Sequence, residues 1–256
     1  MGNAGKKQRS PDAKARVGDK DEAAYLASYK AKDYPRPSVT VDLVVLSILE
    51  GELRLLLIKR LAHPFKGRWA LPGGFVRVGD GFEDQGEDLE HAALRELAEE
   101  TGLPEGSIFI EQLYTFGRAY RDPRMRVITV AYYALLRPEL AVKVVAGSDA
   151  SEATWWSLSQ PGQPELAFDH QEILERALTR IRGKLDYSDI AFELVPATFT
   201  IAELRAVHEV IQATSYDPGN FRRRFNRMLT DGIIEDAPGH RPTSTRPARL
   251  YRFRGR

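Results

Sequence analysis

The sequence predicts an α/β (α+β) fold, with helices packed on a sheet, followed by a second, smaller domain. Three observations support this prediction: segments of alternating β-branched residues, two long segments with helical periodicity, and a basic helical stretch near the C-terminal end. With 256 residues, the chain is long enough for two domains of the usual size. Hydrophobic residues make up 43% and charged residues 29% of the chain, which argues against wholesale disorder.

The first residues, 1–20, are polar and basic and predict a flexible leader. A myristoylation signal is not expected, because Lys6 stands where that motif needs Ser or Thr. No apolar run approaches the roughly 20 residues of a membrane-spanning helix, and the lack of cysteine excludes disulfides, thiolate zinc sites and thiol nucleophiles. We therefore expect a cytoplasmic protein without a membrane partner, in which any metal is held by oxygen or imidazole ligands.

Alternating apolar residues predict the elements of the first domain. Residues 38–47 and 53–58 form the two strands of a hairpin, joined by a turn at residues 50–52. The further expected elements, in chain order, are a helix over 88–101, strands over 108–116, 127–136 and 153–158, and a helix over 170–185. We assign residues 21–183 to this domain and residues 184–256 to the second one.

An acidic segment within the first predicted helix carries the most information. At about 100° per residue, Glu96, Glu99 and Glu100 fall on one stripe of the helix, and Gly102 supplies the left-handed residue that ends it. Three stacked carboxylates repel one another, but a hard divalent cation such as Mg²⁺ or Mn²⁺ converts this repulsion into coordination. An isolated segment of this kind is more often a solvated surface, so its surroundings decide its meaning.

These surroundings resemble the Nudix box, G-x5-E-x7-R-E-U-x-E-E-x-G-U with U aliphatic. The matching residues are Glu87, Arg95, Glu96, Leu97, Glu99, Glu100, Gly102 and Leu103. The resemblance implies an α/β/α sandwich with a mixed sheet, in which Glu96, Glu99 and Glu100 are metal ligands or bases and Arg95 orients a glutamate. It also implies that the loop with Gly73, Gly74 and Phe75 approaches the diphosphate of a ligand.

The spacing before Glu87 departs from the box. Twelve residues separate Gly74 from Glu87, whereas the box expects five. Gly81 satisfies the count, but we interpret this as an accidental match. The sequence therefore predicts an insertion within residues 78–86 that lengthens the loop next to the ligand.

A basic loop lies between the two strands predicted over 108–116 and 127–136. Its polar members and neighbours are Arg118, Tyr120, Arg121, Asp122, Pro123, Arg124 and Arg126. Arg121 and Arg124 could clamp a diphosphate or a terminal ribose, because guanidinium groups bind phosphate oxygens in pairs. The alternative is a solvated turn.

The second domain is strongly basic. Residues 219–256 contain ten arginines and three acidic residues, a net charge of +7. A helix is predicted over 198–212, opened by a capping box of Thr200 and Glu203. Asp217 followed by a proline predicts the start of a second helix, which runs to about residue 230.

The order of the predicted elements is that of a winged helix-turn-helix domain. After the second helix, a loop rich in proline and arginine over 238–249 leads to a strand over 250–253. Arginines can neutralise DNA phosphates, and polar side chains of the second helix can reach base edges in the major groove. The candidate DNA-binding residues are Asn220, Arg222, Arg223, Arg224, Arg227 and, at the tip of the wing, Arg246. The alternative is a basic, solvated dimerisation domain.

A Nudix domain followed by a basic winged helix resembles the NrtR family of Nudix-related transcriptional regulators. Five segments within residues 22–254 carry this likeness: residues 34–42, 115–117, 121–124, 220–223 and 247–251. The resemblance implies a homodimeric repressor of NAD biosynthesis and salvage genes. Its Nudix domain would bind ADP-ribose or a related NAD metabolite, which weakens binding to an inverted-repeat operator in double-stranded DNA.

Two other functions stay open. Because Glu96, Glu99 and Glu100 are all present, the chain could be an Mg²⁺- or Mn²⁺-dependent pyrophosphatase for ADP-ribose or sugar nucleotides, with a C-terminal domain that only aids assembly. It could also combine hydrolysis with repression. A third reading is a Nudix protein that associates with nucleic acids without operator specificity.

Overall fold

The structure, a computed structural model, describes two compact units, Met1–Arg36 and Pro37–Arg256. Its description covers residues 20–30, 33–80, 84–103, 108–144, 150–162, 164–244 and 246–255. Most of the predicted leader, residues 1–19, therefore lies outside the described residues. In the first unit, α1 (Lys20–Ser28) is a helix that the sequence did not predict.

The second unit contains a seven-stranded mixed sheet with the strand order β3-β2-β1-β6-β5, on which β4 pairs with β1 and β7 with β2. The strands are β1 (Ser38–Leu49), β2 (Glu52–Arg60), β3 (Trp69–Ala70), β4 (Gly73–Phe75), β5 (Phe109–Phe116), β6 (Val127–Leu135) and β7 (Ala150–Ser157). The β1 and β6 strands run parallel, and the other pairs are antiparallel. The predicted hairpin is confirmed, with Glu50 and Gly51 of its turn at positive φ. The two short strands β3 and β4 were not predicted.

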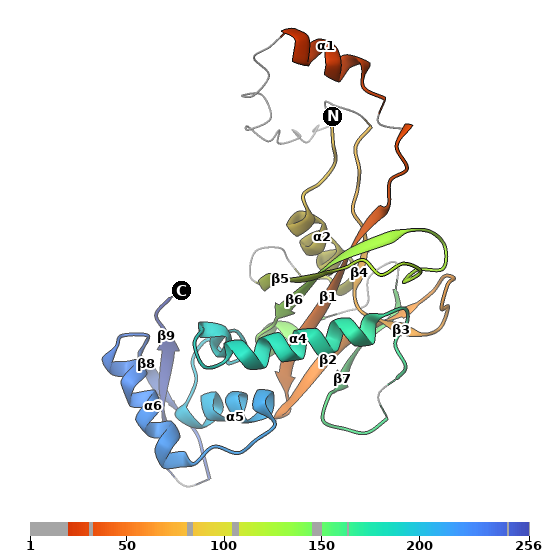
Figure 1. Cartoon of the computed structure of the whole chain (residues 1–256). Helices are drawn as coiled ribbons and strands as arrows, with labels where there is room; N and C mark the ends of the chain where they lie inside the picture. The colour runs from red at the N-terminus through yellow and green to blue at the C-terminus, as the bar shows by residue number, and fades with distance from the viewer. Residues whose placement is uncertain are drawn as a thin grey trace, which may run out of the picture. The chain divides into compact units, whose positions relative to one another are not determined.

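Helices cover both faces of this sheet (Figure 1). The helix α2 (Leu89–Thr101) and the short α3 (Pro138–Ala141) pack on one face, and α4 (His170–Lys184) packs on the other. Alternation along β1 divides its side chains between the faces, since Val45 contacts the α2 side and Val44 the α4 side. The predicted α/β/α sandwich is thus confirmed, as are both of its long helices.

The C-terminal part consists of a 3₁₀ helix η3 (Asp189–Glu193), α5 (Ile201–Gln212), α6 (Pro218–Thr230), β8 (Ile234–Arg241) and β9 (Ala248–Phe253). The predicted capping box is present, because the Thr200 hydroxyl accepts a hydrogen bond from the Glu203 amide (3.2 Å) and the Glu203 carboxylate accepts one from the Thr200 amide (2.7 Å). The predicted start of the second helix is also confirmed, with the Asp217 carboxylate capping the Asn220 amide at 2.8 Å.

The loop predicted over residues 238–249 is shorter than expected. Strand β8 continues to Arg241 and pairs with β9 across an irregularity between Ala237 and His240. Pro238 lies in this bulge, where its missing N–H breaks no ladder hydrogen bond, and Gly239 adopts a φ of 93°. The proline therefore shapes the hairpin rather than ending the strand.

The winged helix packs directly on the end of the sandwich. One apolar cluster includes Ile181 and Leu185 near the end of α4 together with Leu204 and Ile211 of α5 and Phe225 of α6. This cluster fixes the position of α6 relative to α4, whose other end lies at the cavity described next.

In the described part of the chain, no helix is both long and apolar enough to span a bilayer.

Candidate ligand cavity and DNA-binding face

A cavity of about 600 Å³ lies where β1, β4, α2 and the start of α4 meet. This volume suits a ligand of the size of a dinucleotide or sugar nucleotide. The fold brings together here all the residues predicted to be catalytic or ligand-binding: Gly73, Gly74, Phe75, Arg95, Glu96, Glu99, Glu100, Arg121 and Arg124. It adds Asp42, Arg60, Arg77 and His170, which the sequence did not indicate.

The two glycines are required by close contacts on both sides of β4. Gly73 has a φ of 151°, and a Cβ atom there would overlap the Val41 carbonyl oxygen. A Cβ atom on Gly74 would overlap the Glu96 carboxylate. The Gly73 amide donates a hydrogen bond to Glu100 Oε2 at 2.9 Å. The backbone of β4 thus passes within hydrogen-bonding distance of the acidic helix, and position 73 requires glycine because of its positive φ and its approach to the Val41 backbone.

Arg95 is the hub of the acidic helix. Its guanidinium donates two hydrogen bonds to Glu87 (2.6 and 2.9 Å), one to Glu96 (2.7 Å) and one to Glu99 (3.0 Å). The bidentate pair holds the pKa of Glu87 at about 2, well below its usual range. Arg95 therefore contacts three glutamates, and its role in orienting a catalytic glutamate stays a prediction.

Glu96 and Glu100 differ from Glu99 in their surroundings. Burial raises the pKa of Glu96 above its ordinary value, and the charges of Glu99 and Glu87 add to this effect, although Arg95 opposes it. Glu100 is buried, whereas the Glu99 side chain is 45% exposed. The stripe that the sequence predicted therefore contains carboxylates of unequal exposure to solvent.

The acidic helix has the chemistry of a magnesium or manganese site but not the arrangement of one. Three carboxylates are suitable donors for these ions. Within the described ranges, however, no three His, Asp or Glu side chains converge on a point that could hold a metal. Glu96 and Glu99 face Arg95, and Glu99 also accepts a hydrogen bond from Arg77 at 2.8 Å. The assignment of Glu96, Glu99 and Glu100 as metal ligands stays a prediction.

Arg121 and Arg124 both line the cavity but differ in their exposure to solvent. The Arg121 side chain is only 4% exposed, and its guanidinium binds Asp169 at 2.6 and 2.9 Å and Asp42 at 3.3 Å. Arg124 is paired with Asp122 at 2.7 and 3.0 Å, but its side chain is 40% exposed. Arg121 is thus held as part of the wall, and Arg124 is the better placed of the two to reach a ligand.

His170, at the start of α4, ties the wall of the cavity to the backbone before β4. The Leu71 amide donates a hydrogen bond to His170 Nδ1 at 2.9 Å, so the ring proton resides on Nε2, 3.5 Å from Asp42. Burial lowers the pKa of His170, although the Asp42 charge opposes this, and the ring is therefore neutral at pH 7. Sequence reasoning missed both residues; Asp42 was detectable as the single charged residue of a largely apolar strand.

The second predicted site is the outer face of α6. Phe221 and Phe225 of this helix are buried, and the opposite face is polar. Its exposed candidate residues are Asn220, Arg222, Arg223 and Arg227. Arg223 donates a hydrogen bond to the Asn220 side chain, and Arg246 is exposed on the loop between β8 and β9.

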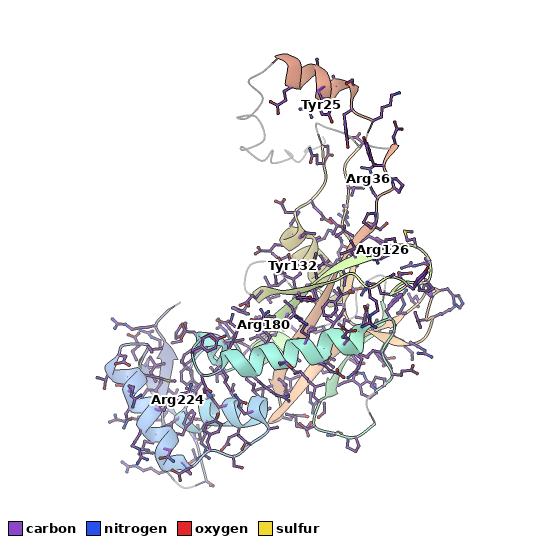
Figure 2. The ribbon with its side chains drawn as sticks, viewed as in Figure 1. Tyr25, Arg36, Arg126, Tyr132, Arg180 and Arg224 are labelled. Atoms are coloured by element: carbon purple, nitrogen blue, oxygen red, sulfur yellow. The ribbon has the colours of Figure 1, made fainter. Side chains whose placement is uncertain are left out.

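Arg224 differs from these residues. It is half-buried, and its guanidinium binds Asp186 at 2.9 Å and the Leu185 carbonyl oxygen at 3.2 Å. Figure 2 labels Arg224 among the side chains of the C-terminal part. Leu185 and Asp186 directly follow α4. Arg224 therefore joins α6 to the sandwich in this structure.

Comparison with known proteins agrees with this arrangement. The chain matches the NUDIX domain family over residues 39–177 and the NrtR DNA-binding winged helix domain over residues 191–253. It is 38% identical over 238 residues, 93% of the chain and 90% of the relative, to the ADPR responsive transcriptional repressor NtrR of Acinetobacter baylyi. The chain belongs to the NrtR family. Both matched ranges of this NrtR chain lie inside the domains assigned from the sequence, 21–183 and 184–256.

Two solved structures of one relative resemble the chain, the first over both parts and the second over the Nudix part alone. Shewanella oneidensis NrtR in complex with a 27mer DNA is 36% identical, with a TM-score of 0.72 over 84% of this chain and 93% of that one. The NUDIX domain of the same protein in complex with ADP ribose is 38% identical, with a TM-score of 0.52 over 62% of this chain and 98% of that one.

Proposed function

We propose that this NrtR-family chain is a DNA-binding transcriptional repressor of NAD biosynthesis and salvage genes that responds to ADP-ribose or a related NAD metabolite. The observation that carries this proposal is the presence, in one packed unit, of a cavity of about 600 Å³ and an exposed basic helix face. The relatives bound to DNA and to ADP ribose support it. Such a regulator acts in the cytoplasm.

The electrostatics of the cavity favour a diphosphate. Burial lowers the pKa of the Arg60 guanidinium and the positive charge of Arg124 lowers it further, whereas the charges of Asp122, Asp42 and Glu100 oppose this effect. Arg60 is fixed in place by its hydrogen bond to the Pro64 carbonyl oxygen (2.9 Å) and lies 4.8 Å from the centre of the Phe168 ring. An anion between Arg60 and Arg124 relieves their repulsion, as the diphosphate of ADP-ribose would.

The proposed response is a linkage between two sites. A ligand that prefers the arrangement that does not bind DNA lowers DNA affinity by its differential affinity for the two states. Helix α4 connects the sites physically, because His170 at its start lies in the cavity and Asp186 just after its end holds Arg224 of α6. Movement of α4 therefore changes the position of the basic helix.

The proposed DNA complex contains a homodimer. Two copies of α6 then lie about one helical turn of DNA apart, and the operator is an inverted repeat. In each half-site, Asn220, Arg223 and Arg227 contact base edges or phosphates, and Arg246 of the wing contacts the backbone or the minor groove.

A mobility-shift assay tests this function. The full chain is titrated onto the promoter region adjacent to its own gene and onto an unrelated duplex, at physiological salt, with and without ADP-ribose. We expect a shift with the promoter only, reversed by ADP-ribose. If the complex persists at saturating ligand, the sensing mechanism is wrong, and equal binding to both duplexes supports a nucleic-acid-associated protein without operator specificity.

A second candidate function is hydrolysis of ADP-ribose. It is favoured by the presence of Glu96, Glu99 and Glu100 and by the hydrogen-bonded Arg95–Glu87 pair. A Mg²⁺ or Mn²⁺ ion would supply charge stabilisation for the diphosphate. Formation of two phosphate monoesters from ADP-ribose, lost in Glu100→Gln, would establish an enzyme beside or instead of a sensor.

A further inference from the structure

The Arg77 side chain binds Glu99, the most accessible of the three carboxylates Glu96, Glu99 and Glu100. Arg77 comes shortly after β4, and its Nη2 atom lies 2.8 Å from Glu99 Oε1. The other oxygen of Glu99 accepts a hydrogen bond from Arg95 Nη1 at 3.0 Å. Both oxygens of this carboxylate are therefore bound by guanidinium groups, which come from two different parts of the fold.

The backbone of Arg77 is held in register with Glu87. The Arg77 amide donates a hydrogen bond to Glu87 Oε1 (2.8 Å), and the Glu87 amide donates one to the Arg77 carbonyl oxygen (3.0 Å). Arg95 in turn holds the Glu87 carboxylate with two hydrogen bonds. The ends of the predicted insertion, 78–86, thus meet at this pair, while Gly81 lies outside the described residues. Arg77 approaches Glu99 from a fixed point of the backbone.

A divalent cation needs the electron pairs that Arg77 now uses. Coordination by Glu96, Glu99 and Glu100 requires Glu99 to leave Arg77 and requires the ion to approach a fixed positive charge. We propose that Arg77 is an internal cation that occupies Glu99 and opposes divalent metal binding at the acidic helix. Without a ligand, the acidic helix therefore has a low affinity for divalent cations; this inference rests on the proposed sensor function.

The same geometry links metal and ligand. Arg77 lines the cavity that contains Arg60 and Arg124, so a diphosphate there competes with Glu99 for its guanidinium. A ligand that draws Arg77 away frees Glu99 for a cation. In the wild-type chain, Mn²⁺ should therefore bind more tightly in the presence of ADP-ribose than in its absence.

Direct measurement of Mn²⁺ binding to the full chain tests the proposal. Free Mn²⁺ is followed by electron paramagnetic resonance, without ADP-ribose, for the wild type, Arg77→Ala and Arg77→Gln. Removal of one positive charge a few ångströms from a divalent ion should tighten Mn²⁺ binding by about tenfold in both variants. Thermal unfolding checks that each variant is folded, which is expected because the Arg77 side chain is 64% exposed.

Two controls make the result specific. Arg68→Ala removes a similar exposed ion pair, Arg68–Glu165 at 2.8 Å, which joins other elements, and should leave Mn²⁺ affinity unchanged. Adding Glu99→Gln to Arg77→Ala should abolish the gain. The proposal is overturned if folded Arg77 variants bind Mn²⁺ no better than the wild type, if Arg68→Ala shows the same gain, or if the gain survives Glu99→Gln. Release of operator DNA by ADP-ribose, measured separately, reports on the proposed function itself.

Discussion

Two arginines of the cavity and three arginines of α6 are placed in opposite ways. Arg95 and Arg121 are almost entirely buried, and each binds two or more carboxylates. Arg222, Arg223 and Arg227 are exposed along one side of a helix whose other side is core. The first group holds the fold and shapes a cavity, because a buried guanidinium is retained only with partners. The second group keeps its charge available for phosphates.

The largest expected effect comes from removing Arg95, one of the two buried arginines. Arg95→Ala leaves the nearby carboxylates of Glu87, Glu96 and Glu99 without their shared cation. Because one partner of a buried ion pair is removed, the free energy of unfolding should fall by about 3 kcal/mol. Denaturant titration of both proteins measures this difference.

Arg118→Ala is the control for that measurement. It also removes an arginine from a salt bridge, with Glu172 at 2.6 Å, but the two side chains are 70% and 50% exposed. Its cost should stay below about 1 kcal/mol. Equal destabilisation by the two substitutions would show that burial does not separate these arginines.

The next effect concerns the exposed arginines of α6. Arg223→Ala combined with Arg227→Ala should weaken operator binding by about tenfold or more and lower the slope of log affinity against log salt by about two, while the free energy of unfolding hardly changes. Fluorescence anisotropy at several salt concentrations measures both quantities. Glu172→Ala, an exposed substitution on α4, serves as a control. An unchanged salt slope would remove the main support for the assigned DNA-binding face.

Local signals in the sequence predicted elements, but not the contacts between them. The capping box at Thr200 and the spacing of the acidic residues depend on a few neighbouring positions, so the helices α5 and α2 could be located. Asp42 of β1 meets Asp169 and His170, two neighbouring residues at the start of α4, only in the folded chain, and the periodicity of the sequence does not predict this contact. Asp42 left a detectable signal as a charge within a buried strand.

Arg224 shows the same limit in the second domain. Helical periodicity placed it beside the exposed arginines of α6, and it was predicted to bind DNA. Its partner Asp186 lies beyond α4, far away in the sequence, and the pairing follows from how the two domains pack. Arg224 thus shares a feature with each group of arginines: it lies on the basic helix α6, but it is half-buried and paired with a carboxylate.

A smaller effect is expected from weakening the contact between Asp186 and Arg224. Asp186→Asn weakens the hold of α4 on Arg224, so the ratio of operator affinities without and with ADP-ribose should fall by about fivefold, with ligand affinity itself changed far less. Glu111→Gln, which removes the partner of Lys184 on the same helix, should leave that ratio unchanged. Anisotropy titrations at fixed ADP-ribose concentrations provide the ratio. A full response in Asp186→Asn would exclude this contact as the connection between the sites.

The smallest effect is a dependence of stability on pH that belongs to the buried group alone. The pKa of Glu87 is about 2 in the folded chain against 4.5 in its ordinary state, so the unfolded chain binds the proton first as pH falls. The stabilisation is complete above pH 5 and is lost as pH falls toward 2, with about 1 kcal/mol lost between pH 7 and pH 4. Arg95→Ala lacks the hydrogen bonds that lower this pKa and should lose correspondingly less over the same interval, whereas the variant without Arg223 and Arg227 should follow the wild type. Urea unfolding of the three proteins at pH 7 and pH 4 decides this. If all three lose equal stability, the Arg95–Glu87 pair does not set the acid response, and the buried and exposed arginines do not differ in their effect on the pH dependence of stability.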